Sequence, residues 1–315
     1  MAKNVKISLL GFKILNGNFN DDLSLNVETM INYFAQNLVK VLPDNPDIIL
    51  FPEACDSYAN FTPEQDRIYY KFRGEKILNY LCDAAKKNHC NIAYSATRNI
   101  SDDEKYPFRN STQIIGRDGK VIGVYDKNHI MVEENTQCDT AYGTEAKVID
   151  SDIGKIACMI CFDLNFNVLL EKYKTQKPDL ILFSSWYHGG LKQQEWAYEC
   201  GSYFASAIAG TQSRIINPFG EVIASTTNYN NFATGKVNLD CTLAHLSYNW
   251  NKFIEMKKKY GEGVTIHDPG YFGIALITCE RDDMTVMDMI KEFDIELFDD
   301  YLERALKHRD ANLVY

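Results

Sequence analysis

Two cysteines, Cys158 and Cys161, stand three residues apart in the segment KIACMICFDLNF, residues 155–166. This spacing can mark a redox pair, half of a zinc site, or one reactive thiol beside an inert one. A redox pair needs both thiols near the start of a helix, whereas KIACMIC is an apolar run typical of a strand. A zinc site needs a second pair of ligands at suitable spacing, and His89 with Cys90 has no matching partner. We therefore expect a single reactive thiol, with no metal and no cofactor.

Cys161 is the better candidate for that thiol. Side chains alternate between the two faces of a strand, so residues 158 and 161 would point to opposite faces unless the strand ends between them. Phe162 and Asp163 follow Cys161 at an expected strand-to-loop corner. Such corners expose a nucleophile and leave backbone N–H groups free to bind an oxyanion. We expect Cys158 to pack in the core, as most free cysteines do.

Two other residues that could do chemistry also follow strand-like runs. Glu53 comes after the apolar run PDIILFP of residues 46–52, where a carboxylate could serve as a general base. Lys127 follows VIGVYD of residues 121–126, and its ammonium could stabilise a developing negative charge. Taken singly, each is more often an ordinary surface residue. The case for chemistry at Cys161 therefore depends on whether these residues act together with it.

The elements that must position these residues alternate between strand and helix patterns, without a linker or low-complexity segment. We expect strands at 3–12, 46–53 and 90–97, helices at 24–42 and 75–88, and tight hairpins around 117–120 and 217–220. The end of the chain, 285–309, predicts two amphipathic helices. We take residues 1–315 as a single domain. Within it, 241–315 form a C-terminal extension used in packing or oligomerisation.

Composition excludes several functional classes. The formal net charge is −10, which argues against nucleic-acid binding because that depends on Lys and Arg neutralising phosphates. No stretch approaches the ~20 apolar residues of a membrane helix, and the start of the chain has too short an apolar run for a signal peptide. The nine cysteines are then expected to be reduced thiols in the cytoplasm.

Three short motifs in this order resemble those of the nitrilase superfamily of carbon–nitrogen hydrolases: FPEAC at 51–55, YDKNHI at 125–130 and CFDLNF at 161–166. The stretches 109–120, 213–224 and 233–240 are also similar to strands of that family, so the resemblance covers roughly residues 4–240. It implies an α/β fold of the four-layer αββα sandwich type and pairing into a homodimer or a higher even homo-oligomer. One departure is that Asn165, Phe166 and Asn167 replace the Arg-Phe-Pro-Glu that many members have at this place.

The resemblance also implies roles for the motif residues. Cys161 would be the nucleophile, Glu53 the base, and Lys127 with the backbone N–H of Phe162 would hold the oxyanion. The reaction would be hydrolysis of a small linear amide through a cysteine thioester, releasing ammonia and a carboxylic acid.

Many members carry a second glutamate after the lysine that orients it. Glu133 and Glu134 are the candidates here, and we take Glu134.

Substrate specificity should come from side chains at the rim of the sheets. Trp186, Tyr187 and His188 follow the strand-like run PDLILFSS of 178–185, and Tyr58 follows Glu53 shortly. Aromatic side chains at these places could wall a small pocket, and His188 could bind a polar group of the substrate.

Three alternatives remain open from sequence. The segment 127–130, KNHI, looks like that of the N-carbamoyl amine hydrolases, and nitrile hydrolysis occurs in the same superfamily. A histidine, His129 or His188, could activate Cys161 in place of Glu53, as in Cys–His hydrolases. The chain could also be a catalytically silent binding or assembly protein that keeps the fold.

Overall fold

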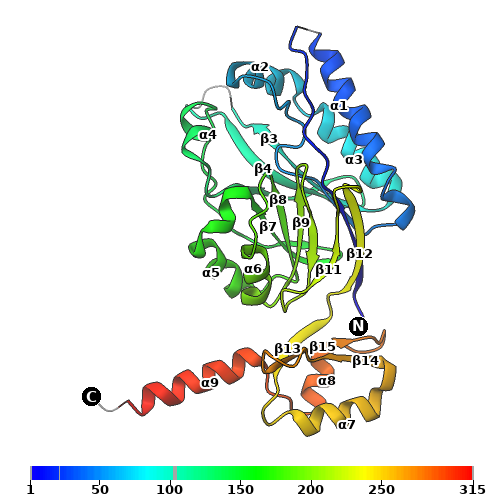
Figure 1. Cartoon of the computed structure of the whole chain (residues 1–315), viewed down its shortest axis with the longest axis vertical. Coiled ribbons are helices and arrows are strands. Elements are labelled where there is room, and N and C mark those ends of the chain that lie inside the picture. Colours follow the sequence, from blue (N-terminus) through cyan, green and yellow to red (C-terminus); the bar gives the residue numbers. More distant parts are fainter. Residues whose placement is uncertain (1, 21, 102–104, 314–315) are drawn as a thin grey trace. The chain divides into compact units, whose positions relative to one another are not determined.

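The computed structural model describes residues 2–20, 22–101 and 105–313, which divide into two compact units. The first unit is Val5–Lys236; the second comprises the residues before Val5 and those from Val237 onward. Figure 1 shows the ribbon of both units, coloured along the sequence. The division falls near residue 241, where the sequence suggests that an extension begins. That the whole chain acts as a single domain stays a prediction.

One layer of the first unit is a six-stranded sheet of order β12-β1-β2-β3-β4-β5. Strands β1, β2 and β3 run parallel, and β4 and β5 continue the sheet as antiparallel strands. In sheet order, the bounds are β12 Phe232–Asn238, β1 Asn4–Leu10, β2 Ile48–Leu50, β3 Asn91–Asn99, β4 Phe108–Ile115 and β5 Val121–Asp126.

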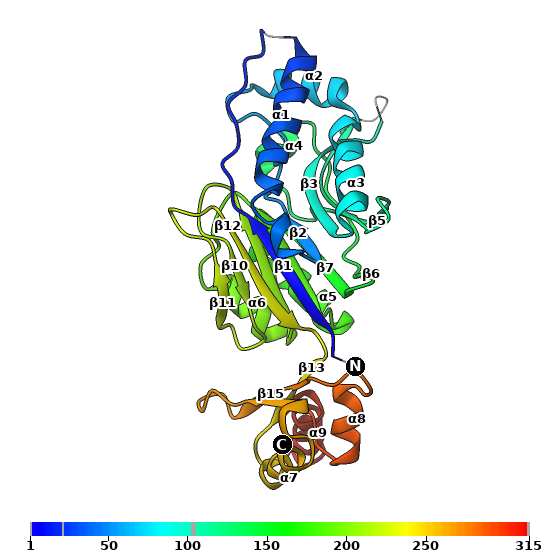
Figure 2. The ribbon, with the colours of Figure 1, turned by 90° about the vertical axis from the view of Figure 1, so that its right-hand side faces the viewer.

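Three helices cover the outer face of this sheet: α1 (Leu23–Leu38), α2 (Pro63–Arg73) and α3 (Lys76–Asn88). Figure 2 shows α1 and α3 beside the first strands of the sheet. Their buried residues recur at helical spacing, as Met30 and Phe34 do in α1, and pack with strand residues such as Ile49 into one core.

A second six-stranded sheet has the order β11-β10-β9-β8-β7-β6. Its bounds are β11 Val222–Ser225, β10 Arg214–Ile216, β9 Tyr203–Ile208, β8 Leu180–Ser185, β7 Gly154–Ile160 and β6 Ile149–Ser151. Strands β7, β8 and β9 run parallel. Helices α5 (Asn167–Gln176) and α6 (Lys192–Cys200) cover its outer face.

The two sheets pack face to face. In β7, Ala157 and Met159 join the core under α5 and α6, whereas Cys158 lies on the opposite face of the strand and is fully buried. Strand β4 contacts β7 and β2 contacts β9, and the Ser184 hydroxyl donates to the carbonyl of Phe51 across the interface at 2.8 Å. This confirms the expected four-layer αββα sandwich.

The second unit has its own three-stranded sheet of order β13-β15-β14, with bounds Cys241–His245, Ile274–Cys279 and Val264–His267. Helices α7 (Trp250–Tyr260), α8 (Val286–Glu292) and α9 (Phe298–Ala311) accompany it. The last two confirm the helices expected at the end of the chain. Residues of α7, α8 and the strands form a separate core, whereas α9 has no buried residue.

The sequence-derived elements of the first unit are present, with shorter bounds at some ends. The strand expected at 46–53 spans only Ile48–Leu50, so Glu53 lies in the loop beyond it. Helix α2 was missed, as were α5 and α6. Among the described residues, no helix is long and apolar enough to cross a membrane.

Candidate active site

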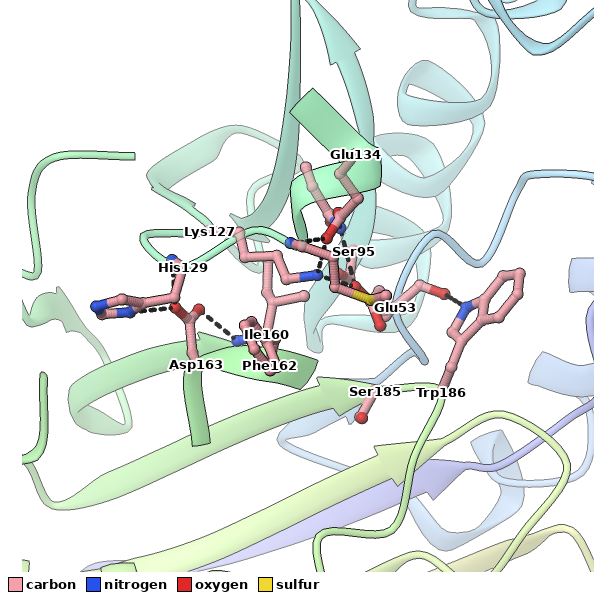
Figure 3. A network of polar contacts seen from close by, with 12 residues as sticks. Glu53, Ser95, Lys127, His129, Glu134, Ile160, Phe162, Asp163, Ser185 and Trp186 are labelled. Carbon is pink, nitrogen blue, oxygen red and sulfur yellow. Dashed lines mark hydrogen bonds and ion pairs between the residues drawn. The ribbon is translucent and has the colours of Figure 1, made fainter. Parts of the chain in front are cut away.

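The three motif residues meet at the carboxyl ends of their strands, as Figure 3 shows for Glu53 and Lys127. Lys127 follows β5, and its Nζ lies 2.8 Å from Oε1 of Glu53 and 2.8 Å from Oε2 of Glu134. Lys127 is 2% exposed and Glu53 5% exposed, so this ion pair is shielded from water. The structure thus places Glu134 against the lysine, whereas Glu133 is exposed.

Asn110 of β4 ties the two carboxylates together. Its Nδ2 donates to Oε1 of Glu53 at 2.9 Å and to Oε1 of Glu134 at 3.0 Å. The backbone N–H of Lys127 donates to the Asn110 carbonyl at 2.8 Å, which extends the pairing of β4 and β5 by one residue. Each carboxylate therefore accepts from both Lys127 and Asn110. Sequence analysis did not single out Asn110, because a lone polar residue in a strand carries no distinctive signal.

Cys161 stands at the sharp corner where β7 ends. The strand stops at Ile160, a single turn of 3₁₀ helix covers Cys161–Asn165, and α5 follows. Cys161 has φ of +48°, a left-handed conformation that costs a non-glycine residue about 1–3 kcal/mol and is typical of functional sites. The strand ends between the two cysteines, so Cys158 remains in the core while Cys161 reaches the corner.

Asp163 joins the nucleophile corner to the loop that carries the lysine. Its Oδ2 accepts from the Ile160 N–H at 3.1 Å and from the Tyr125 hydroxyl at 2.8 Å. Its Oδ1 accepts from the backbone N–H of His129 at 2.8 Å and lies 3.0 Å from Nδ1 of the same residue. Asp163 is fully buried. The Asp163 carboxylate therefore fixes the position of the Cys161 corner relative to the loop that carries Lys127.

The electrostatics of the site keep the thiol protonated and the lysine charged. Burial, and then the Glu53 carboxylate, raise the pKa of Cys161 to about 12, although Lys127 and a hydrogen bond with Ser185 act in the opposite direction. Burial alone would lower the pKa of Lys127, but Glu53 and Glu134 outweigh it and raise the pKa above its usual value. A free thiolate is thus rare at neutral pH, and the nucleophile needs a base at the moment of attack.

A cavity of about 360 Å³ opens directly over these groups. Cys161, Glu53, Lys127 and Glu134 all line it. The other lining residues are Ala54, Ser57, Tyr58, Ala59, Phe61, Pro63, Asp66, Arg67, Tyr70, Thr97, Asn110, Met131, Cys138, Thr140 and Trp186. Its size suits a small organic molecule.

The aromatic residues expected at the rim are partly in place. Tyr58 and Trp186 line the cavity. The indole N–H of Trp186 donates to the backbone carbonyl of Glu53 at 2.7 Å, which fixes the loop that carries the base. The Tyr58 hydroxyl donates to the carbonyl of Asn26 at 2.6 Å, so its ring is held as a wall.

Two expected binding residues do not line the cavity. The Phe162 side chain packs edge-on against Phe166, with ring centroids 5.1 Å apart, which leaves only its backbone N–H as a candidate oxyanion donor. His188 precedes two glycines with positive φ and accepts a hydrogen bond from the Gly190 N–H through its own Nδ1. His188 is not among the described residues that line this cavity, and its contact with a substrate stays a prediction.

The structure also disfavours the Cys–His alternative. His129 Nδ1 lies against Asp163, and its ring stacks on Phe166 with centroids 3.9 Å apart. Neither His129 nor His188 is among the described residues that line the cavity with Cys161. In the same described part of the chain, no group of three or more His, Cys, Asp or Glu side chains could hold a metal ion.

Helix α2, which the sequence analysis missed, walls the other end of the cavity. Its first turn is fixed by a capping box in which Thr62 and Gln65 each accept from the other's backbone N–H. The TPEQ sequence at 62–65 was the available signal for this helix. It brings Asp66, Arg67 and Tyr70 to the cavity.

Comparisons with known proteins identify the family to which the chain is similar. The family model of the carbon–nitrogen hydrolases matches residues 14–242. Among curated relatives, deaminated glutathione amidase of Dictyostelium discoideum is 23% identical over 68% of this chain and 84% of its own length. A probable nitrilase of Schizosaccharomyces pombe is 25% identical over 64% of this chain and 78% of its own length.

Solved structures show the same fold at lower identity. Nit3 of Saccharomyces cerevisiae, a member of the nitrilase superfamily, matches with a TM-score of 0.62 and 18% identity over 75% of this chain and 90% of that one. An amidase from Nesterenkonia sp., solved as a double mutant with acrylamide, matches with a TM-score of 0.60 and 12% identity over 82% of this chain and 97% of that one.

Proposed function

The chain belongs to the carbon–nitrogen hydrolase family, and on that premise we propose that it hydrolyses a small linear amide through a thioester on Cys161. The observation that carries this proposal is the convergence of Glu53, Lys127 and Cys161 on one cavity, with Lys127 Nζ 2.8 Å from the Glu53 carboxylate. A thiol, a base and a fixed cation are what attack on an amide carbon requires.

In the first half of the reaction, the Cys161 sulfur attacks the amide carbon while Glu53 takes the thiol proton. The negative charge that develops on the amide oxygen is stabilised by the Lys127 ammonium and by the backbone N–H of Phe162. Protonated Glu53 then gives its proton to the leaving nitrogen. The C–N bond breaks, ammonia departs, and the acyl group remains on sulfur.

In the second half, water attacks the thioester carbon while Glu53 takes a proton from it. The same oxyanion donors act again, the C–S bond breaks, and the sulfur regains its proton from Glu53 as the carboxylic acid is released. Glu134 acts by position: it holds Lys127 at 2.8 Å and accepts from the Met131 N–H at 2.8 Å.

The relatives support an amidase, since one curated relative is a deaminated glutathione amidase and one structural neighbour is an amidase bound to acrylamide. The chief alternative is an N-carbamoyl amine, for which the same site would release carbon dioxide together with ammonia and an amine. A nitrile is the third candidate. Pairing of the chain into a homodimer or a higher even homo-oligomer stays a prediction.

A panel of linear amides, N-carbamoyl amines and nitriles, assayed for ammonia and carbon dioxide, tests the proposal. The intact protein should release ammonia from amides without carbon dioxide, and Cys161→Ala should abolish the release. Cys158→Ala is the matched control, because that thiol lies in the core away from the cavity, and it should keep turnover. Activity that survives Cys161→Ala would refute the thioester mechanism, and absence of any turnover or thiol reactivity would favour a silent binding protein.

A further inference from the structure

The far end of the cavity holds a carboxylate without a partner. Asp66 of α2 lines the cavity, and its Oδ1 is buried with no hydrogen-bond partner among the described residues. No hydrogen bond or ion pair to its other carboxylate oxygen is found in that part of the chain either. Buried polar groups are nearly always paired, so an unpaired one at a cavity wall calls for an explanation.

The cations of the cavity are already engaged elsewhere. Arg67 Nη1 donates to Asp139 Oδ2 at 3.1 Å and to the carbonyl of Gln137 at 2.9 Å. Lys127 is held between Glu53 and Glu134. The lining residues therefore comprise three carboxylates and two cations, and both cations are bonded to carboxylates other than Asp66.

Asp66 interacts electrostatically with other residues that line the cavity. Its negative charge contributes to raising the pKa of Tyr70 and the pKa of Cys138, which line the same cavity. The charge of Glu134, at the reacting end, also contributes to raising the pKa of Cys138. Burial and the carboxylate of Asp56 behind it raise the pKa of Asp66 to about 7. Arg73, the nearby cation, pairs with Asp56 and not with Asp66. A cation bound beside Asp66 would stabilise the ionised carboxylate.

Aromatic side chains also line the cavity. Tyr58 and Phe61 pack with ring centroids 4.8 Å apart and both line the cavity, as does Tyr70. Such walls suit an aliphatic stem, and aromatic faces tolerate a cation. A molecule that fits this arrangement has an amide at one end, an apolar chain, and a positively charged nitrogen at the other.

Building on the proposed function, we propose that Asp66 selects amides whose far end carries a primary ammonium group, as in ω-amino amides. The ammonium donates to the Asp66 carboxylate, the stem lies along Tyr58 and Phe61, and the amide reaches Cys161. An amide that ends in a carboxylate is excluded, since it would face Asp66 without a free cation to bind it.

The test separates binding from turnover. In the inactive Cys161→Ala background, calorimetry measures the affinity for ω-amino amides of increasing chain length and for the unsubstituted amides of equal length. At the best-fitting length the ω-amino amide should bind at least about tenfold more tightly, as expected for a charge-assisted hydrogen bond. Adding Asp66→Asn should remove that preference while leaving the unsubstituted amide within about threefold. Glu64→Gln, an exposed carboxylate on the same helix, is the matched control and should keep the preference.

The outcomes distinguish the two proposals. If no chain length shows a preference for the amine, or if Asp66→Asn weakens both ligands equally, the role of Asp66 is overturned. If the preference is present and lost in Asp66→Asn, but the protein with Cys161 intact cleaves neither amide, then Asp66 binds the amine and the proposed hydrolysis is wrong. If the protein cleaves unsubstituted amides but Asp66→Asn does not change the preference for the ω-amino amide, the proposed hydrolysis stands and the proposed role of Asp66 is wrong.

Discussion

Two buried cations of the first unit, Lys127 and Arg73, are paired in different ways. Lys127 lies between Glu53 and Glu134 and faces a cavity that also contains a thiol. Arg73 contacts Asp56, the Tyr94 hydroxyl at 3.1 Å and the carbonyl of Thr97, and does not line that cavity. Both cations are almost completely buried, at 2% and 4% exposure.

The difference shows why burial of an ion pair does not by itself identify a catalytic site. The Arg73 cluster joins α2 to β3, and the thiol beside it, Cys55, is fully buried and does not line the cavity. The Lys127 cluster has two carboxylates for one cation. Glu53 can therefore gain and lose a proton while Glu134 still holds the lysine. We expect changes at Lys127's partners to affect the reaction, and changes at Arg73's partners to affect the free energy of unfolding.

The largest effect should come from Glu53→Gln. Loss of the base is expected to lower kcat about 100- to 10,000-fold, while the midpoint of chemical unfolding changes little because Glu134 still pairs with Lys127. Steady-state ammonia release and a denaturant titration measure the two quantities. A variant that keeps most of its turnover would show that Glu53 is not the base.

Asp163→Asn should have the next largest effect on activity. The amide keeps the size of the side chain but cannot accept from Tyr125, the Ile160 N–H and His129 at once, so the corner and the lysine loop lose their common tie. A small misplacement of reacting groups can cost up to about 100-fold in rate. Alkylation of Cys161 should still occur, since the thiol itself is unchanged. A kcat equal to that of the unchanged protein would contradict this positioning role.

Arg73→Met should instead lower stability. It leaves the charge of Asp56 buried without its counter-ion, although the Tyr94 hydroxyl still donates to it, and breaking a buried pair from one side costs about 3–5 kcal/mol. Urea unfolding measures the loss, and turnover per folded molecule should fall far less than in Glu53→Gln. The double variant Asp56→Asn with Arg73→Met should recover part of the stability. If the double variant is as unstable as the single one, the buried charge is not the cause.

The smallest effect is a difference between two thiols. Iodoacetamide should label Cys161 before Cys158, because Cys161 lines the cavity and Cys158 is fully buried. With the pKa of Cys161 raised to about 12, its thiolate fraction and labelling rate should rise about tenfold per pH unit below that value. Peptide mapping by mass spectrometry follows both thiols. Equal labelling, or a plateau near neutral pH, would disagree with this environment.

The reacting end of the cavity was predictable from sequence because Glu53, Lys127 and Cys161 each follow a strand-like run. Carboxyl ends of strands gather at one rim, so the local patterns could place these residues together. Their proposed roles came from the resemblance of the three motifs to the nitrilase superfamily, because each residue taken singly looked like an ordinary surface residue. Sequence analysis did not predict that Asn110 and Asp66 belong to the cavity. Asn110 is a polar residue inside a strand, and Asp66 lies on a helix whose capping box was overlooked. Their importance comes from what lies opposite them in the folded chain. His188 was expected at the substrate cavity because it follows β8. It precedes a turn at Gly189 and Gly190, and it does not line the cavity.

The central claim, that Cys161 forms a thioester through Glu53, is tested most directly by the mass of the intact protein after mixing with a cleaved amide and rapid acid quenching. The account predicts an added acyl group, mapped by peptide digestion to Cys161, that disappears as substrate is exhausted and does not form in Glu53→Gln. Steady hydrolysis in which the quenched protein carries its acyl group on another residue, or in which Glu53→Gln acylates as fast as the unchanged protein, would contradict it.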